Sequence, residues 1–165
     1  MESERTAGKS LREPKETIAT RYSFVHSDDI FTHQQQMRDP DYAYYTVQEG
    51  DNSAGYVILR GLTSADRSLE LKRIVIAEPG HGVGTQVLRA VIDKKFFEFH
   101  ANRLWLDVFE DNHRARHVYR SLGFVEETTP SNFFQGGDRE RLLIAMSMPE
   151  SKHRHDRLCW RNGLR

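Results

Sequence analysis

The sequence predicts an α/β (α+β) fold with a mixed, mostly antiparallel central sheet flanked by helices. Segments rich in aromatic and β-branched residues come first in the chain, and strand and helix patterns alternate after them. A glycine-rich turn also joins one predicted strand directly to an amphipathic helix. Such an order is typical of helices packed on the faces of one sheet. A chain of 165 residues is about the length of one domain.

The first elements are a short helix and a β-hairpin. Residues 28–38 suit a helix that ends before Pro40, because the residue preceding a proline disfavours helical geometry. Residues 43–47 and 54–59 have strand composition and are separated by turn residues, so they predict a hairpin. Residues 68–76 predict a third strand. Unless a bulge resets the alternation, one face of that strand carries Glu70, Lys72, Ile74 and Ile76.

The next helix follows the glycine cluster and has about four turns. Its apolar residues recur at helical spacing and are Val87, Leu88, Val91, Ile92, Phe96 and Phe99. Residues 104–109 form a nearly continuous apolar run, which predicts a central strand covered on both faces.

The last predicted elements are a helix and two extended segments. Asp111 or Asn112 can cap the helix, and Gly123 suits its end. Its apolar face carries Ala115, Val118, Tyr119 and Leu122. Extended structure resumes at Phe124 and Val125, and residues 141–148 predict the final strand.

The two ends of the chain differ from its body. Residues 1–20 are polar without apolar periodicity and predict a flexible arm, and residues 150–165 predict a flexible basic tail. Residues 21–149 form the predicted domain. Cys159 is the only cysteine, so no intrachain disulfide can form.

Composition excludes several functional classes. The 24 basic and 24 acidic side chains cancel, which argues against a broadly basic nucleic-acid-binding surface. No apolar run is long enough for a membrane helix, and the first residues lack the apolar core of a signal peptide. We therefore expect a cytoplasmic protein that binds neither nucleic acid nor membranes.

Residues 74–85 carry the strongest chemical signal, because a strand enters a glycine-rich loop that opens into a helix. The first N–H groups of a helix and flexible glycines suit phosphate binding. The alternative is a tight turn that uses glycine only for its dihedral angles. The dinucleotide fingerprint does not fit, because Thr85 stands where a third glycine or alanine belongs.

Two motifs together resemble the GNAT acetyltransferase superfamily. Residues 79–84 occupy the register of its Arg/Gln-x-x-Gly-x-Gly/Ala loop, and residues 112–124 resemble its later Asn, Ala, Tyr and Gly-Phe series. The resemblance covers roughly residues 43–148. Pro79 stands where the family usually has Arg or Gln, and His81 could offer a hydrogen-bond donor near the diphosphate instead.

The resemblance implies an N-acetyltransferase that moves an acetyl group from acetyl-CoA to a primary amine of a small molecule or peptide, by direct attack in a ternary complex. The strand from Ile74 through Val75 to Ile76 would face the pantetheine arm. Asn112 would bind the pantetheine or acetyl end, although it could simply cap its helix. The loop residues that would hold the diphosphate are Gly80, His81, Gly82, Val83, Gly84 and Thr85.

The resemblance also assigns two catalytic roles. Tyr119 is the candidate acid, because a phenol with a pKa near 10 can protonate a thiolate whose conjugate acid has a pKa near 8.5. Its alternative role is packing on the apolar face of its helix. Glu70 is the candidate base, and its alternative is an ordinary ion pair with Lys72 or Arg73. Glu110 or an ordered water chain could replace it.

The remaining expectations concern metals, acceptors and partners. We expect no metal site, although His113 and His117 are four residues apart and the tail contains His153, His155 and Cys159. The resemblance places acceptor pockets at residues 31–45 and 128–139. An exposed edge of the late strands could pair in a homodimer. Two alternatives remain: a noncatalytic CoA-binding or regulatory module, and a protein-interaction domain on the same fold.

Overall fold

The computed structural model describes residues 11–12, 30–49, 51–78, 80–127, 133–136 and 139–149. Its elements, in chain order, are β1 (Leu11–Arg12), α1 (Ile30–Arg38), β2 (Tyr42–Glu49), β3 (Asn52–Arg60), β4 (Ser68–Ile76), α2 (Val83–Phe97), β5 (Arg103–Phe109), α3 (His113–Ser121), β6 (Val125–Glu126), β7 (Phe133–Gly136) and β8 (Arg139–Pro149).

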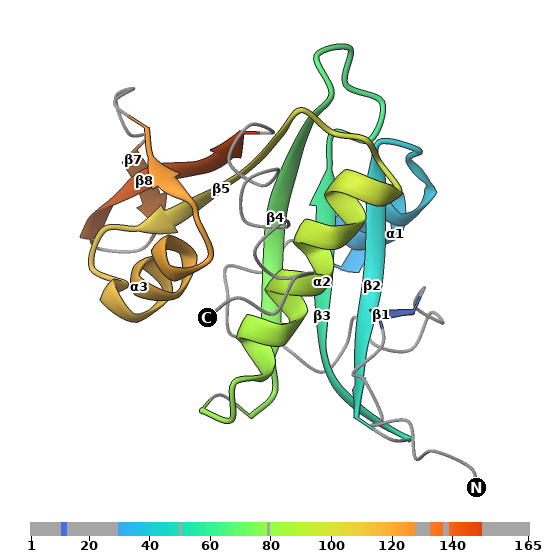
Figure 1. Cartoon of the computed structure of the whole chain (residues 1–165), viewed down its shortest axis with the longest axis horizontal. Helices are drawn as coiled ribbons and strands as arrows, with labels where there is room; N and C mark the ends of the chain where they lie inside the picture. Colours follow the sequence, from blue (N-terminus) through green and yellow to red (C-terminus); the bar gives the residue numbers. More distant parts are fainter. Residues whose placement is uncertain are drawn as a thin grey trace, which may run out of the picture.

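The sheet is mixed and mostly antiparallel, as predicted. Its strand order is β1-β2-β3-β4-β5-β8-β6, with β7 paired to β8 outside this path. Among the described strands, only β4 and β5 pair in parallel. Figure 1 shows α2 in front of β2, β3 and β4. Helix α3 lies next to the end of β5, on the other side of β4 from β3.

The early elements agree with the sequence prediction. The β2–β3 hairpin pairs Tyr42 with Arg60 at one end and Glu49 with Asn52 at the other. The described part of α1 begins at Ile30, two residues after its predicted start, and ends at Arg38. Leu11, in the segment predicted to be an arm, pairs with Val47 in a short strand. Residues 1–10 and 13–20 of that arm lie outside the described part, as does the predicted tail, 150–165.

A β-bulge in β4 resets its side-chain alternation. Ile58 pairs with Arg73 whereas the next residue, Leu59, pairs with Leu71, so Lys72 is the extra residue. Before the bulge, Leu71 packs in the core, and after it Ile74 packs against the same core. Glu70 therefore faces the opposite side of the sheet from Ile74. The sequence prediction placed these residues on one face only if no bulge interrupted the strand, and the bulge at Lys72 separates them.

The sheet splits between β4 and β5. These strands pair only where Ser68–Glu70 meets Arg103–Trp105. Farther along, β5 stays paired with β8 as far as Phe109, while β4 stays paired with β3 as far as Ile76. Figure 1 shows the two strands diverging from their shared end. The split leaves one edge of each strand without a partner among the strands that the structure describes.

The prediction that β5 is covered on both faces is wrong. Leu104, Leu106 and Val108 are buried, but Asp107 between them is exposed. Burial alternates along β5, but the sequence does not show this, because Trp105 and Phe109 on the less buried face are apolar as well. The predicted internal position is confirmed, since β5 lies between β4 and β8.

Helix α2 covers the core with the predicted apolar face. Val87, Leu88, Val91 and Ile92 are all buried. The same face includes Lys95, which has no exposed surface. The long side chain lies in the core between α2 and the end of β8, a position that hydrophobic periodicity alone does not predict.

The segment expected to form a late acceptor loop contains a strand. Within the predicted range 128–139, residues Phe133–Gly136 form β7 and pair with β8, beginning with Phe133 opposite Leu142. Residues 128–132 and 137–138 lie outside the described part. Part of the late segment assigned to an acceptor pocket is therefore a strand.

Candidate functional site

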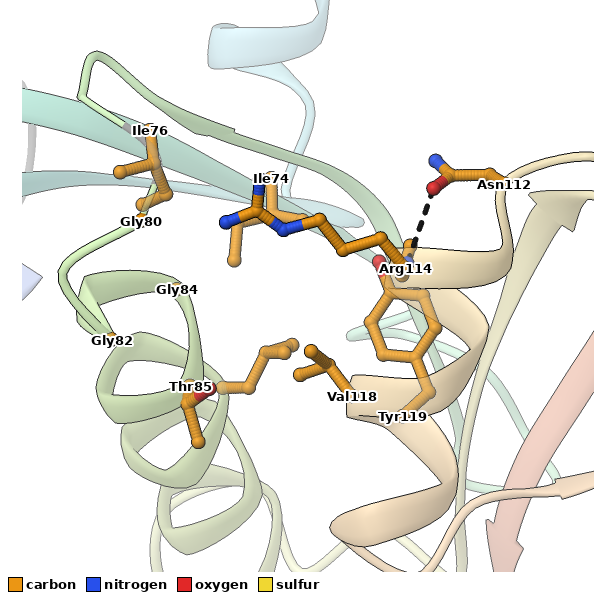
Figure 2. A pocket seen from close by; sticks show the side chains of 12 residues that line it. Ile74, Ile76, Gly80, Gly82, Gly84, Thr85, Asn112, Arg114, Val118 and Tyr119 are labelled. Atoms are coloured by element: carbon orange, nitrogen blue, oxygen red, sulfur yellow. Dashed lines mark hydrogen bonds between the residues drawn. The ribbon is translucent and has the colours of Figure 1, made fainter.

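A cavity of about 270 Å³ lies where the split in the sheet meets α2 and α3. Figure 2 shows residues from the end of β4, the glycine turn, α2 and α3 around it. The lining residues are Ile74, Ile76, Gly80, Gly82, Gly84, Thr85, Leu88, Asn112, Arg114, Ala115, Val118 and Tyr119. The two sequence motifs, far apart in the chain, thus form one cavity.

The glycine turn has two residues with left-handed backbone geometry. Gly80 has φ 120° and Gly82 has φ 75°, a region that L side chains rarely adopt. Gly82 is the N-cap of α2, and no side chain caps this helix. The dihedral alternative therefore accounts for two of the glycines.

Gly84 is different, because its φ is not positive. A Cβ placed there would lie 3.8 Å from Ile76 Cγ1, in ordinary contact, so packing does not require glycine either. Glycine in a helix costs up to about 1 kcal/mol relative to alanine. Its missing side chain leaves the main chain at the start of α2 accessible from the cavity, where partial positive charge is concentrated.

The residues predicted to bind the cosubstrate do not all line this cavity. Ile74 and Ile76 line the cavity, whereas Val75 is not among its lining residues. His81 and Val83 also lie outside this cavity and instead line a neighbouring one beside Glu78. The site thus combines an apolar β4 wall with a polar glycine turn.

Asn112 lines the cavity and caps α3. Its Oδ1 accepts a hydrogen bond from the Ala115 N–H, with an N···O distance of 3.1 Å, drawn as the dashed line in Figure 2. Capping was the alternative role for this side chain. The side-chain oxygen of Asn112 therefore caps α3, while the residue also borders the cavity.

Tyr119 is buried on α3 and lines the cavity. Its ring packs at a tilt against Phe124, with centroids 5.8 Å apart, and Figure 2 shows its hydroxyl directed toward the cavity. Burial raises the pKa of this phenol above its usual value of 10.0. The packing role and an available hydroxyl therefore occur together.

Glu70 is not part of this cavity. It belongs to the last β4–β5 pair, opposite Trp105, and its Oε2 lies 2.6 Å from Arg60 Nη2. Burial raises the pKa of Glu70, whereas the charges of Arg60 and Lys72 act in the opposite direction. Glu70 lines a separate polar cavity of about 420 Å³ together with Arg60, Trp105 and Arg103. Tyr119 and Glu70, the two predicted catalytic residues, therefore line different cavities.

Arg114 is a cavity residue that the sequence analysis missed. Figure 2 shows its side chain extending from the start of α3 toward Ile74. It precedes Val118 by four residues, and residues at this spacing share a helix face. This spacing is the sequence feature from which the position of Arg114 at the cavity could have been predicted.

No group of three or more potential metal-ligating side chains occurs among the residues that the structure describes. His113 and His117 are both exposed on α3. The tail residues His153, His155 and Cys159 lie outside the described ranges. In the same described ranges, no helix is long and apolar enough to cross a membrane.

The split sheet and the glycine turn bring an unpaired strand edge and the start of a helix to one cavity, an arrangement that suits an anionic ligand. Comparison with known families is more specific, since the model described as the acetyltransferase (GNAT) family matches residues 11–124. The chain belongs to the GNAT acetyltransferase family, as the two motifs predict.

The relatives of this chain include spermidine N(1)-acetyltransferases. The chain is 29% identical over 117 residues to the enzyme of Escherichia coli, in an alignment that covers 70% of this chain and 62% of that protein. It is 27% identical over 131 residues to the Vibrio cholerae enzyme, covering 76% and 75% of the two chains. The match to the Escherichia coli protein therefore spans less than two thirds of its length.

Solved structures of the Vibrio cholerae spermidine N-acetyltransferase share the fold. A complex of that protein with CoA and spermine has a TM-score of 0.75 at 21% identity, covering 90% of this chain and 99% of that chain. A dodecameric structure has a TM-score of 0.67 at 25% identity, covering 75% and 74%. These likenesses confirm the predicted fold class.

Proposed function

We propose that this chain is an N-acetyltransferase that transfers the acetyl group of acetyl-CoA to a primary amine. Family membership supports the class of reaction. The observation that carries the proposal is the cavity itself, because it combines the glycine turn, the unpaired edge of β4 and Tyr119.

The cavity fits the parts of the cosubstrate. Gly84 leaves open the approach to the start of α2, where main-chain N–H groups can bind a diphosphate. The apolar Ile74 and Ile76 can contact the pantetheine arm. Beyond Glu70, the β4 edge has no strand partner among the described residues, so its backbone groups can bind the arm and the acetyl oxygen.

Acetyl-CoA supplies an activated thioester. As the amine attacks, a C–N bond forms and the C–S bond breaks, so the nitrogen must lose a proton and the sulfur must gain one. Tyr119 suits the second transfer. Its pKa, raised by burial, keeps the hydroxyl protonated at neutral pH, and its direction toward the cavity lets it donate that proton to the departing sulfur.

Glu70 suits the first transfer if the amine approaches from the opposite face of the sheet. The residue lies where β4 and β5 separate and faces away from the cavity side, so an acceptor on that face would meet it near the split. Burial raises its pKa and makes its carboxylate a stronger proton acceptor, although Arg60 opposes this effect. We assign Glu70 as the base, acting directly or through water.

The relatives suggest the first acceptors to test. Their names give spermidine as a substrate, so polyamines belong in the panel with monoamines and peptides. Assembly into a homodimer or larger oligomer is also part of the proposal, because one solved relative is dodecameric.

The experiment measures thiol release from acetyl-CoA with this amine panel, together with calorimetric binding of CoA. CoA binding and amine-dependent release would support the proposal. Binding without release for any amine would favour a noncatalytic CoA-binding module. Absence of binding at millimolar CoA, with no rise in thermal stability, would favour a protein-interaction domain.

A further inference from the structure

We infer that Arg114 binds the diphosphate of coenzyme A from the cavity wall opposite the glycine turn. The inference rests on the proposed function, because it takes this cavity as the coenzyme A site. Arg114 is the second residue of α3 and lines the cavity. In Figure 2 the glycine turn lies on one side of the opening, and the Arg114 guanidinium reaches toward it from the other.

The charge distribution around the cavity singles out this side chain. Among the described residues that line the cavity, Arg114 alone has a formal charge. Residues 79–85 contain neither lysine nor arginine, so the turn contributes backbone dipoles rather than a permanent positive charge. A diphosphate is anionic, and a guanidinium can bind two of its oxygens with parallel, charge-assisted hydrogen bonds. The opposite wall thus supplies the charge that the turn lacks.

The other arginines of α3 are already engaged. Arg116 Nη2 lies 2.8 Å from Glu126 Oε1, and Arg120 pairs with the same carboxylate. Arg116 also donates a hydrogen bond to the main-chain oxygen of Glu110. Arg114 makes no ion pair or side-chain hydrogen bond with any other described residue. Its guanidinium is therefore available to a ligand.

The position of Arg114 in its helix also favours an anionic ligand. A helix N-terminus carries partial positive charge, so a cation there is disfavoured unless an anion lies nearby. The first turn of α3 has no acidic residue, and neither has that of α2. The starts of both helices border the same cavity. A bound diphosphate would offset the repulsion between Arg114 and its own helix.

The test compares Arg114→Gln with Arg120→Gln, a control that removes an arginine of the same helix away from the cavity. Calorimetry measures the Kd of CoA and of dephospho-CoA, which retains the diphosphate but lacks the 3′-phosphate. An NMR titration measures pantetheine, which lacks both. Losing a charge-assisted bond should raise Kd for both diphosphate ligands on the order of 10- to 100-fold and leave pantetheine unchanged. Arg120→Gln should change none of them.

Three results would overturn the inference: unchanged Kd values in Arg114→Gln, an equal loss for pantetheine, or a loss for CoA but not for dephospho-CoA. If Arg114→Gln does not fold, Arg114→Lys is measured instead and should show a smaller loss for the same two ligands. Wild-type binding without thiol release would refute the proposed activity alone. A wild-type chain that binds none of the ligands would refute both proposals.

Discussion

Lys95 donates a hydrogen bond from Nζ to the main-chain oxygen of Met148, with an N···O distance of 2.9 Å, inside the core between α2 and β8. The ammonium also lies 4.2 Å from the centre of the Phe96 ring. Because the side chain has no exposed surface, its stem packs as an apolar residue while its charge is held by polar and aromatic partners.

Replacing Lys95 should therefore lower the free energy of unfolding. Lys95→Ala removes both the buried stem and the donor to Met148, and we expect a loss of about 2–4 kcal/mol. Lys95→Met keeps most of the stem and should lose less. Urea unfolding monitored by circular dichroism measures both variants. Equal stability of Lys95→Ala and the wild type would contradict this account of the core.

Local patterns in the sequence were sufficient to predict the helices and the hairpin. The apolar spacing from Val87 to Ile92 fixes the buried face of α2, and Gly123 ends α3 with φ 96°. These features depend on neighbours within a few residues, so one sequence contains the necessary information. The motif residues that line the cavity were predictable for the same reason, although their joint placement came from the resemblance.

The position of Glu70 could not be predicted in this way. Strict alternation puts it on the same face as Ile74, and a single extra residue, Lys72, reverses that relation. A bulge depends on how β4 pairs with β3, which is a tertiary property rather than a local one. The split between β4 and β5 is likewise set by long-range pairing. Both features decide which predicted site residues share a cavity.

Tyr119→Phe should lower kcat with little change in acetyl-CoA affinity. The variant keeps the ring that packs on Phe124 and removes only the proposed proton donor. A lost general acid typically costs about 10²- to 10⁴-fold in rate. Steady-state kinetics with the best amine of the panel, together with calorimetry, provide the measurement. A variant with wild-type kcat would exclude Tyr119 as the acid.

Because burial raises the pKa of Tyr119, the midpoint of the alkaline decline of kcat should lie above pH 10, where loss of the phenolic proton removes the donor. The pH profile of wild-type kcat, restricted to conditions in which the fold is intact, tests this expectation. A decline centred near neutral pH would mean that another group supplies the proton.

The acid side of the profile should report Glu70. A base must be deprotonated, so kcat/KM should fall as the pH decreases through the raised pKa of Glu70, above the ordinary glutamate value of about 4.3. Glu70→Gln should abolish this limb and lower the rate. Glu110→Gln is the matched comparison, because Glu110 is an exposed carboxylate at the end of β5. If only Glu110→Gln removes the limb, Glu110 is the base.

The raised pKa of Glu70 should also make stability depend on pH. The proposed catalysis needs the deprotonated carboxylate, whereas the fold favours the protonated carboxyl. A folded-state pKa above the unfolded value means that the folded state favours the protonated carboxyl. Stability from this group is full below the unfolded pKa and is lost as the pH rises through the folded one. The free energy of unfolding of the wild type, relative to Glu70→Gln, should therefore decrease from pH 4 toward neutrality. An increase over that range would contradict the burial of Glu70.

Gly84→Ala should separate folding from cofactor binding. Gly84 lacks a positive φ, and a Cβ there would make an ordinary 3.8 Å contact with Ile76, so alanine should raise stability by up to about 1 kcal/mol. The same methyl group would project into the cavity wall at the start of α2 and weaken CoA binding. Urea unfolding and calorimetry on one sample test both signs.

Gly82→Ala is the matched variant, because a Cβ at Gly82 would meet no atom within 4 Å but the φ of this residue is 75°. An L side chain in this conformation costs about 1–2 kcal/mol, so Gly82→Ala should lower stability. If the turn used glycine only for its dihedral angles, Gly84→Ala would bind CoA as the wild type does. Increased stability with reduced affinity in Gly84→Ala, beside reduced stability in Gly82→Ala, would instead establish that Gly84 is retained for close approach of the ligand.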